Sequence, residues 1–386
     1  MYSFYNVYLR EFPQEGFTTI YNLLTNELAC FASKNLFPEP NKLITEKLVE
    51  KGIWLSKFSN EHDFAIKRFK ETVFSKEELV LVLLLTSKCN CKCVYCYENE
   101  VNLNFTDFCE YDKTLEFINK KMREDNIKNL RIVYYGGEPL LNKKVINKLS
   151  SELRDRYKEN YMFSIVTNGT LLNENDVNEW IKLGLAKVKI TLDGNSNSHD
   201  KRRPYRDGQK TYDDIVNNIS HISEQVKIVI NIIIDETLSG VEEMIKDLTN
   251  KGIKATYSLS FKEPEISDIE IKKDLLIQFS KILKDQEVNY LTNLRTRHGI
   301  ICPGKRVNYY VIDGIGNIYN CESYLKHCIG NLRTEEKNDY IYKIKDKCNK
   351  CKYLPICYGE CMYESACQKE YFDILLPELL KLYIQS

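Results

Sequence analysis

The chain has 386 residues with 55 basic and 55 acidic side chains, so its formal net charge is zero and no stretch forms a nucleic-acid-binding patch. Hydrophobic residues make up 43% of the chain, enough for ordinary cores, but no apolar run approaches the length of a membrane span. The length favours two or three domains. Because the amino terminus lacks the pattern of a secretion signal, we expect a cytoplasmic protein that binds neither nucleic acid nor membranes.

Residues 1–75 are predicted to form a separate module. Strand-like stretches are followed by a helix that ends at Gly52 and by a second helix, a pattern similar to a winged-helix unit. The expected elements are strands at 5–12, 18–31 (with a turn near 25–26) and 53–55, and helices at 41–51 and 62–69.

Residues 76–290 alternate short apolar strands with amphipathic helices, which is typical of a parallel sheet covered on its outer face. Six such units predict an α/β fold, a partial (βα)6 TIM barrel, with its functional groups on loops at the carboxyl ends of the strands. The expected strands are 79–86, 130–135, 163–167, 188–192, 226–234 and 254–259, and the expected helices are 113–123, 144–158, 174–183, 212–224 and 241–251.

Residues 291–386 lose this alternation and are rich in cysteine, and a helix at 369–382 is expected to close the chain. The whole chain contains fourteen cysteines. In a reducing compartment, cysteines in such numbers are more often metal ligands than disulfides.

Cys89, Cys93 and Cys96 follow the first barrel strand in the pattern CxxxCxxC. Three thiolates at this spacing can hold three irons of a [4Fe–4S] cluster and leave the fourth iron open. A zinc site is the alternative, and it would need a fourth ligand, for which Cys91 is the only spare cysteine in the loop.

This loop resembles the hallmark of the radical S-adenosylmethionine (SAM) superfamily. The resemblance implies that SAM chelates the open iron and is cleaved by one electron to methionine and a 5′-deoxyadenosyl radical. It makes Cys89, Cys93 and Cys96 the ligands, leaves Cys91 a bystander, and places Tyr95 near the adenine.

Further motifs fall at strand ends, where a barrel carries its ligands. Gly136-Gly137-Glu138-Pro139 resembles the family's GGEP motif, and the run from Thr191 to Arg203 resembles its LDG…HDxxR signature. The resemblance implies contacts to SAM from Gly136, Gly137, Glu138, Pro139, Thr167, Asn168, Thr191, Asp193 and Arg203. Plain turns and a solvated basic run are the alternatives.

The carboxy-terminal cysteines are similar in spacing to a SPASM domain, which generally holds two auxiliary [4Fe–4S] clusters. The resemblance assigns Cys302, Cys321 and Cys361 to the first, and Cys348, Cys351, Cys357 and Cys367 to the second. Cys328 is a candidate fourth ligand of the first auxiliary cluster. Without it, the fourth iron of that cluster would be open and could bind a substrate thiolate. A zinc ribbon would explain only Cys348 and Cys351.

Together these features resemble radical SAM/SPASM maturases of ribosomal peptides, of the thioether-forming sactipeptide type. We expect SAM and three [4Fe–4S] clusters as cofactors, a precursor peptide whose leader binds residues 1–75, and an electron donor such as a flavodoxin or ferredoxin. Candidate bases are Asp193, Glu322 and Glu360, which the sequence does not rank. The alternatives are an anaerobic sulfatase-maturating enzyme that makes formylglycine, which the long segment before Cys89 disfavours, and a non-catalytic Fe–S carrier or scaffold.

Overall fold

The computed structural model describes residues 1–55, 60–96, 105–234, 237–261, 268–290, 302–334, 344–359, 367 and 369–385. Its strands form two sheets, one of three strands and one of ten. The fold is mixed α/β with a parallel central sheet, as the sequence predicts.

The amino-terminal residues form an antiparallel sheet in the order β1 (Asn6–Arg10), β2 (Phe17–Asn22) and β3 (Leu28–Ala32), followed by α1 (Lys42–Glu50) and α2 (Glu61–Val73). One face of this sheet packs on α1 through Ile20, Ala29, Ile44 and Leu48. The long strand expected at 18–31 is therefore a hairpin. The strand expected at 53–55 is reduced to a single bridge between Trp54 and Tyr2.

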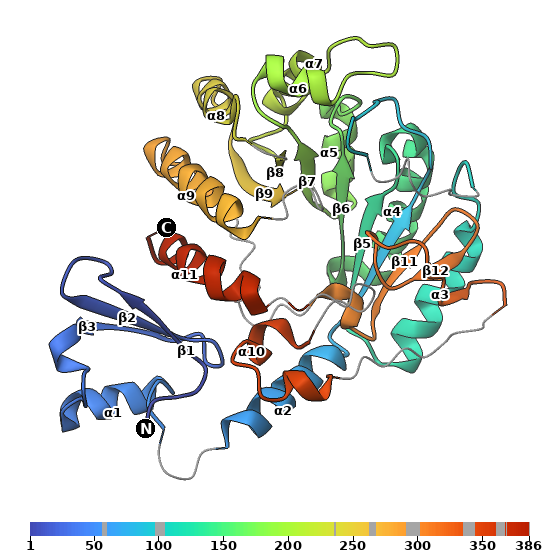
Figure 1. Cartoon of the computed structure of the whole chain (residues 1–386). Helices are drawn as coiled ribbons and strands as arrows, with labels where there is room; N and C mark the ends of the chain where they lie inside the picture. Colours follow the sequence, from blue (N-terminus) through green and yellow to red (C-terminus); the bar gives the residue numbers. More distant parts are fainter. Residues whose placement is uncertain are drawn as a thin grey trace.

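The carboxy-terminal helix α11 (Lys369–Gln385) joins this module to the rest of the molecule. It contacts β1 and also α9 (Ile269–Asp285), and it lies between them in Figure 1. Tyr5 and Leu9 of the module belong to the same buried core as Leu375 and Leu376 of α11, so the helix is held from both sides.

All six predicted barrel strands are confirmed, and they lie side by side in chain order. Their bounds are β4 (Glu78–Leu84), β5 (Asn129–Tyr135), β6 (Tyr161–Thr167), β7 (Leu185–Thr191), β8 (Lys227–Ile234) and β9 (Ala255–Phe261). The predicted helices are α3 (Tyr111–Glu124), α4 (Lys143–Tyr157), α5 (Glu174–Lys182), α7 (Tyr212–Ser220) and α8 (Val241–Asn250). The sequence analysis missed α9 and the short α6 (Ser196–Arg202).

The two faces of the barrel sheet carry different side chains. Val188 and Ile190 of β7 are fully buried in the core that includes the surrounding helices. Side chains alternate along a strand, so Lys187, Lys189 and Thr191 face the inside of the barrel. The helices cover the outer face, as Figure 1 shows.

The cysteine-rich region extends the barrel sheet, which the sequence did not predict. Strand β11 (Tyr309–Ile312) pairs in parallel with β4, and β12 (Asn317–Tyr319) and β13 (Gly330–Asn331) follow antiparallel. The opposite edge carries β10 (Asn289–Tyr290) beside β9. One sheet thus runs through the expected boundary at 290/291, and the division of the chain at 75/76 and 290/291 stays a prediction.

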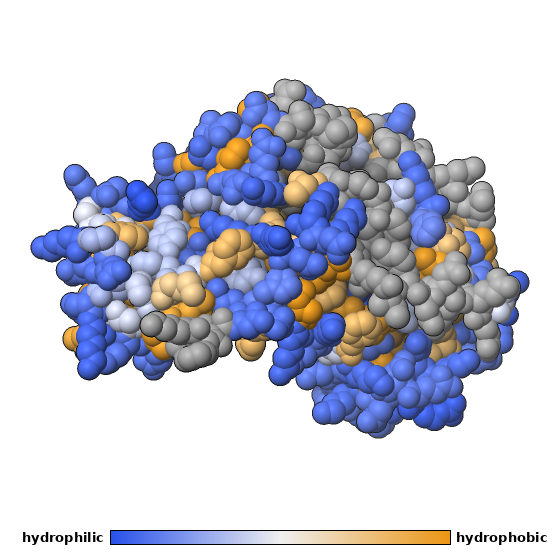
Figure 2. All heavy atoms as spheres, turned by 60° about the horizontal axis from the view of Figure 1, so that its bottom comes forward, coloured by the Kyte–Doolittle hydropathy of each residue, from blue (hydrophilic) through white to orange (hydrophobic). Residues whose placement is uncertain are grey.

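In the described part of the chain, no helix is long and apolar enough to cross a membrane. Figure 2 shows a face that is mostly hydrophilic, with hydrophobic side chains in separate small groups.

Candidate active site

The loop that carries Cys89, Cys93 and Cys96 is fixed against the segment that follows α6. The amides of Lys92 and Val94 donate to the carbonyls of Pro204 (2.8 Å) and Arg202 (3.0 Å). The Nε of Arg206 donates to the carbonyl of Cys89 at 2.5 Å. Two segments that are distant in sequence therefore define the position of the three thiols.

The GGEP motif fixes the same loop from the other side. The amides of Gly137 and Glu138 donate to the carbonyls of Thr86 and Lys88, both at 2.8 Å. Gly136 has φ of +115°, and a Cβ at Gly137 would lie 2.2 Å from the Lys88 carbonyl oxygen. The two glycines thus permit the close approach of two backbones, the GGEP turn and the start of the cysteine loop.

Glu138 is fully buried at the end of β5. Its Oε1 accepts hydrogen bonds from the Thr167 hydroxyl (2.7 Å) and the Leu140 amide (3.0 Å), and its Oε2 accepts from the Asn168 amide (2.7 Å). Burial, partly offset by these bonds, raises the pKa of Glu138 to about 7. Its Oε2 keeps a lone pair that can accept from an ammonium group.

An amide network links the end of β6 to the cysteine loop. The Nδ2 of Asn168 donates to Asn90 Oδ1 at 2.8 Å and lies 3.8 Å from the Cys89 sulfur. Asn90 in turn donates to the Thr170 hydroxyl at 2.8 Å. The sequence analysis missed Asn90, because it lies between two predicted ligands and matches no motif.

Asp193, Tyr95 and Arg203 form a second buried network at the end of β7. The Tyr95 hydroxyl donates to Asp193 Oδ2 and accepts from Arg203 Nη1 at 2.7 Å. Asp193 Oδ1 accepts from the Ile233 amide at 2.9 Å, and Arg202 Nε lies 3.5 Å from Oδ2. This engagement makes Asp193 an anchor for the site rather than a free base.

His199 contacts this network through the backbone of Asp193. Its Nδ1 accepts a hydrogen bond from the Asp193 amide at 3.1 Å, and its ring packs on Tyr212. Burial, and then the neighbouring cations of Arg203 and Arg202, lower the pKa of His199 well below its ordinary value. His199 is therefore neutral, and it positions the Asp193 loop as an acceptor.

These residues fit SAM. Among the described residues, Arg203 Nε is buried without a hydrogen-bond partner, so a donor is available for a carboxylate, while Glu138 can accept from an amine. Thr191 ends β7 on the inner face of the barrel, and Pro139 is buried in the turn after Glu138.

The thiols of the cysteine loop lie in different environments. Hydrogen bonds from Cys91 lower the pKa of Cys89 to about 6, whereas burial raises the pKa of Cys93 to about 11. Among the described residues, no three Cys, His, Asp or Glu side chains converge to hold a metal ion. The assignment of a [4Fe–4S] cluster to this loop stays a prediction.

The four cysteines expected for the second auxiliary cluster line one pocket in the described structure: Cys348, Cys351, Cys357 and Cys367. A buried lysine lies beside it. The Nζ of Lys305 donates to the carbonyls of Cys357 (3.0 Å), Tyr358 (3.4 Å) and Gly359 (2.9 Å). Lys305 follows Cys302 by three residues, so it joins the two predicted cluster sites, and no motif marked it.

The first auxiliary site is described only in part, because Cys361 and the candidate base Glu360 lie outside the described residues. Cys302 and Cys321 are partly buried near Tyr309, whose hydroxyl donates to Glu322 at 2.5 Å. Cys328 is exposed, and its sulfur donates to the carbonyl of Gly330 at 3.0 Å. Its role as a fourth ligand stays a prediction.

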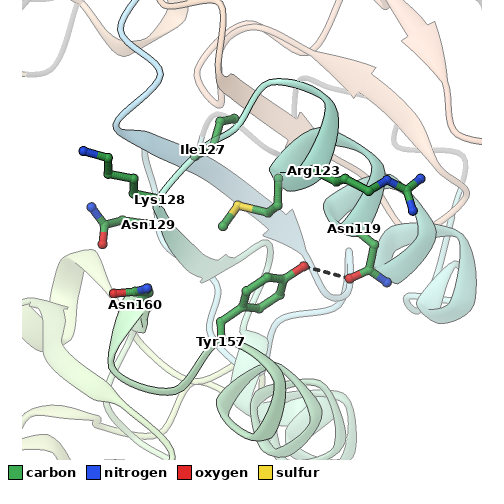
Figure 3. A pocket seen from close by; sticks show the side chains of 8 residues that line it. Asn119, Arg123, Ile127, Lys128, Asn129, Tyr157 and Asn160 are labelled. Atoms are coloured by element: carbon green, nitrogen blue, oxygen red, sulfur yellow. Dashed lines mark hydrogen bonds between the residues drawn. The ribbon is translucent and has the colours of Figure 1, made fainter.

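A pocket of about 530 Å³ lies away from all of these residues. It is formed between α3 and α4, where the Tyr157 hydroxyl donates to Asn119 Oδ1 at 2.7 Å (Figure 3). Residues 127–129 in its wall lead into the amino end of β5, opposite the ligand-binding end of a parallel barrel. It contains none of the motif residues.

Comparison with known proteins bears on the barrel. The Radical SAM superfamily matches residues 83–248. The chain is 23% identical to the cysteine-type anaerobic sulfatase-maturating enzyme of Clostridium perfringens, over 78% of this chain and 97% of that protein.

Two solved structures share the fold. Native anSMEcpe with bound AdoMet and Cp18Cys peptide has a TM-score of 0.62 at 20% identity, covering 80% of this chain and 99% of its own. Streptococcus suis SuiB bound to precursor peptide SuiA has a TM-score of 0.55 at 15% identity, covering 94% and 95%.

The match at residues 83–248 and the fold support a radical SAM enzyme. More particularly, the spacing of its carboxy-terminal cysteines and its likeness to the sulfatase-maturating enzyme support the SPASM type, with SAM and iron–sulfur clusters as cofactors. An enzyme of this class is not a silent carrier or scaffold.

Proposed function

We propose that this enzyme modifies a ribosomally made precursor peptide and that it forms a thioether between a cysteine sulfur and a carbon of that peptide. The observation that carries the proposal is the amino-terminal module. SuiB, which was solved with its precursor peptide, covers 94% of this chain, whereas anSMEcpe covers 80%. The wider coverage by SuiB supports a comparison that includes residues outside the barrel.

The module offers a surface for a leader peptide. Strand β3 is the last strand of its sheet, and in the described structure its outer edge pairs with no other strand. Leu28 on this strand and Leu43 on α1 are exposed, at 37% and 64%. A leader that adds a strand to β3 gains backbone hydrogen bonds from the edge and apolar contacts from these side chains.

The site residues have separate roles in this proposal. Cys89, Cys93 and Cys96 hold the cluster, while Glu138 binds the amine of SAM and Arg203 its carboxylate. When bound, SAM and the clusters supply a carbon radical and the one-electron transfers that remove two hydrogen atoms from the peptide.

A base must take the thiol proton of the substrate cysteine. Glu322 is the best-placed described candidate, because it follows Cys321 directly and its carboxylate faces the inside of the barrel, where it acts on Lys189. Tyr309 holds this carboxylate in position. Asp193 is already engaged by Tyr95 and the Ile233 amide.

Co-expression tests the proposal. A tagged Cys-containing precursor peptide, taken from a short reading frame beside the gene where one is found, is expressed with the enzyme or with its Cys93→Ala variant. With the unchanged enzyme alone, we expect the peptide to lose the mass of two hydrogen atoms and its cysteine to resist alkylation. A peptide of unaltered mass in both would contradict the proposal.

A second function is favoured by the likeness to the cysteine-type sulfatase-maturating enzyme. Conversion of a cysteine to formylglycine removes its sulfur and leaves an aldehyde. Hydrazine labelling of the product separates the two, because a thioether does not react.

A further inference from the structure

The inner face of the barrel carries a row of basic side chains below the SAM site. On β7, Lys189 lies two residues before Thr191 and Lys187 lies four residues before it, so all three face the same side of the strand. Along the strand, Lys189 is about 7 Å and Lys187 about 13 Å from Thr191. Lys187 pairs in register with Lys227 of β8. Three cations therefore share one surface.

No acidic side chain of the described residues forms an ion pair with Lys187 or Lys189, which distinguishes them from their neighbour. Arg131 on β5 forms an ion pair with Glu78, in which Nη2 and Oε1 lie 2.8 Å apart. Glu322 acts on Lys189 only from a longer distance and is already hydrogen-bonded to Tyr309. Lys189 is half-buried and Lys187 is exposed.

Burial and neighbouring cations disfavour the charged form of both amines. Burial lowers the pKa of Lys189, and the cation of Lys187 lowers it further. Burial also lowers the pKa of Lys187, together with Arg131 and Lys227. An anion between them would relieve both effects, since opposite charge favours the ammonium form.

We propose that Lys189, supported by Lys187, binds a carboxylate of the substrate peptide inside the barrel, one step below the SAM site. The carboxylate belongs to an aspartate or glutamate near the modified residue or to the end of the peptide chain. This inference rests on the proposed function, since it takes the substrate to be a peptide. The same row of cations rejects a lysine or arginine at that position.

The test is protection of Lys189 from acetylation in the anaerobic holoenzyme with SAM, read by mass spectrometry. Three probe peptides are compared: acetyl-Ala-Cys-Ala-Asp-Ala-Gly-amide, its Asn counterpart, and that Asn peptide with a free carboxyl end. We expect at least one carboxylate peptide to slow acetylation of Lys189 by about tenfold relative to the Asn amide. Protection by the Asp peptide identifies a side-chain carboxylate; protection by the free end identifies the chain terminus.

Lys182 is the internal control, because it lies on the outer surface in a pair with Glu179 and should acetylate equally in all samples. Equal acetylation of Lys189 with all three peptides would overturn the proposal, as would protection by inorganic phosphate alone. The readout needs no turnover. Protection without peptide modification in the co-expression test would leave this site standing and refute only the thioether function.

A variant supplies a second measurement. Lys189→Met should abolish the preference for the carboxylate peptide in stimulating 5′-deoxyadenosine release, and Lys189→Arg should restore it. Lys182→Met should behave as the unchanged enzyme. A preference that survives in Lys189→Met would overturn the assignment.

Discussion

The Nη1 of Arg203 donates a hydrogen bond of 2.7 Å to the hydroxyl of Tyr95, although 108 residues separate them. Tyr95 belongs to the cysteine loop, and Arg203 follows α6, so this bond joins two halves of the proposed SAM site. Because Arg203 Nε remains without a partner, the guanidinium keeps a donor for the ligand.

Arg203→Lys should weaken SAM binding by about tenfold, since an ammonium cannot contact both Tyr95 and a carboxylate with a rigid fork. Anaerobic calorimetry with the reconstituted enzyme measures it. Arg154→Lys, a surface change at a residue paired with Glu159, is the matched control and should bind SAM normally. Equal affinities in all three proteins would show that Arg203 does not contact SAM.

The buried Glu138 predicts a pH dependence. Its pKa is raised to about 7, so in the free enzyme it loses its charge as the pH falls below that value. Only the carboxylate can accept from the SAM ammonium while its other bonds are kept. Affinity for SAM should therefore fall by about tenfold per pH unit below 7.

Glu138→Gln removes this titration, so its weaker affinity should fall less steeply below pH 7 than that of the unchanged enzyme, with only the amine of SAM still titrating. The same slope in enzyme and variant would assign the pH dependence to another group.

Lys305 predicts a link between the cluster sites. Lys305→Met leaves three buried carbonyls without their donor and should lower the stability of the unreconstituted protein by about 1–3 kcal/mol, measured by denaturant unfolding. It should also shift the reduction potentials of the auxiliary clusters, because a buried cation is lost nearby. An unchanged unfolding curve, with Lys182→Met as the control, would contradict this role.

The auxiliary cysteines predict a separation of two activities. Cys351→Ala should spare SAM cleavage more than peptide modification, because Cys351 lines a pocket distinct from the Cys89 loop. Release of 5′-deoxyadenosine and peptide mass are measured on the same samples. Equal loss of both would argue against a separate role for that site.

The sequence predicted the barrel well because its information is local. Apolar runs such as those of β4 and β8 predict strands at the same residues, and the glycines of GGEP predict a close approach of two backbone segments. The pairing of β11 with β4 could not be predicted, because β11 is short and its partner is more than 200 residues away. Lys305 and Asn90 were missed for a related reason, since their partners become neighbours only after folding.

Cysteine spacing predicted the cluster sets, and the structure brings together the four assigned to the second auxiliary site. If all three sites hold [4Fe–4S] clusters, the reconstituted protein should contain about 12 irons per chain. An iron content near 4 would remove both auxiliary clusters from the account.

The central claim is that Cys89, Cys93 and Cys96 leave one iron open for SAM. The most direct measurement is electron paramagnetic resonance of the reduced, oxygen-free holoprotein in which Cys351→Ala and Cys302→Ala remove the auxiliary signals. The account predicts that adding SAM changes the remaining cluster spectrum. A spectrum that SAM leaves unchanged, in protein that contains the cluster, would contradict it.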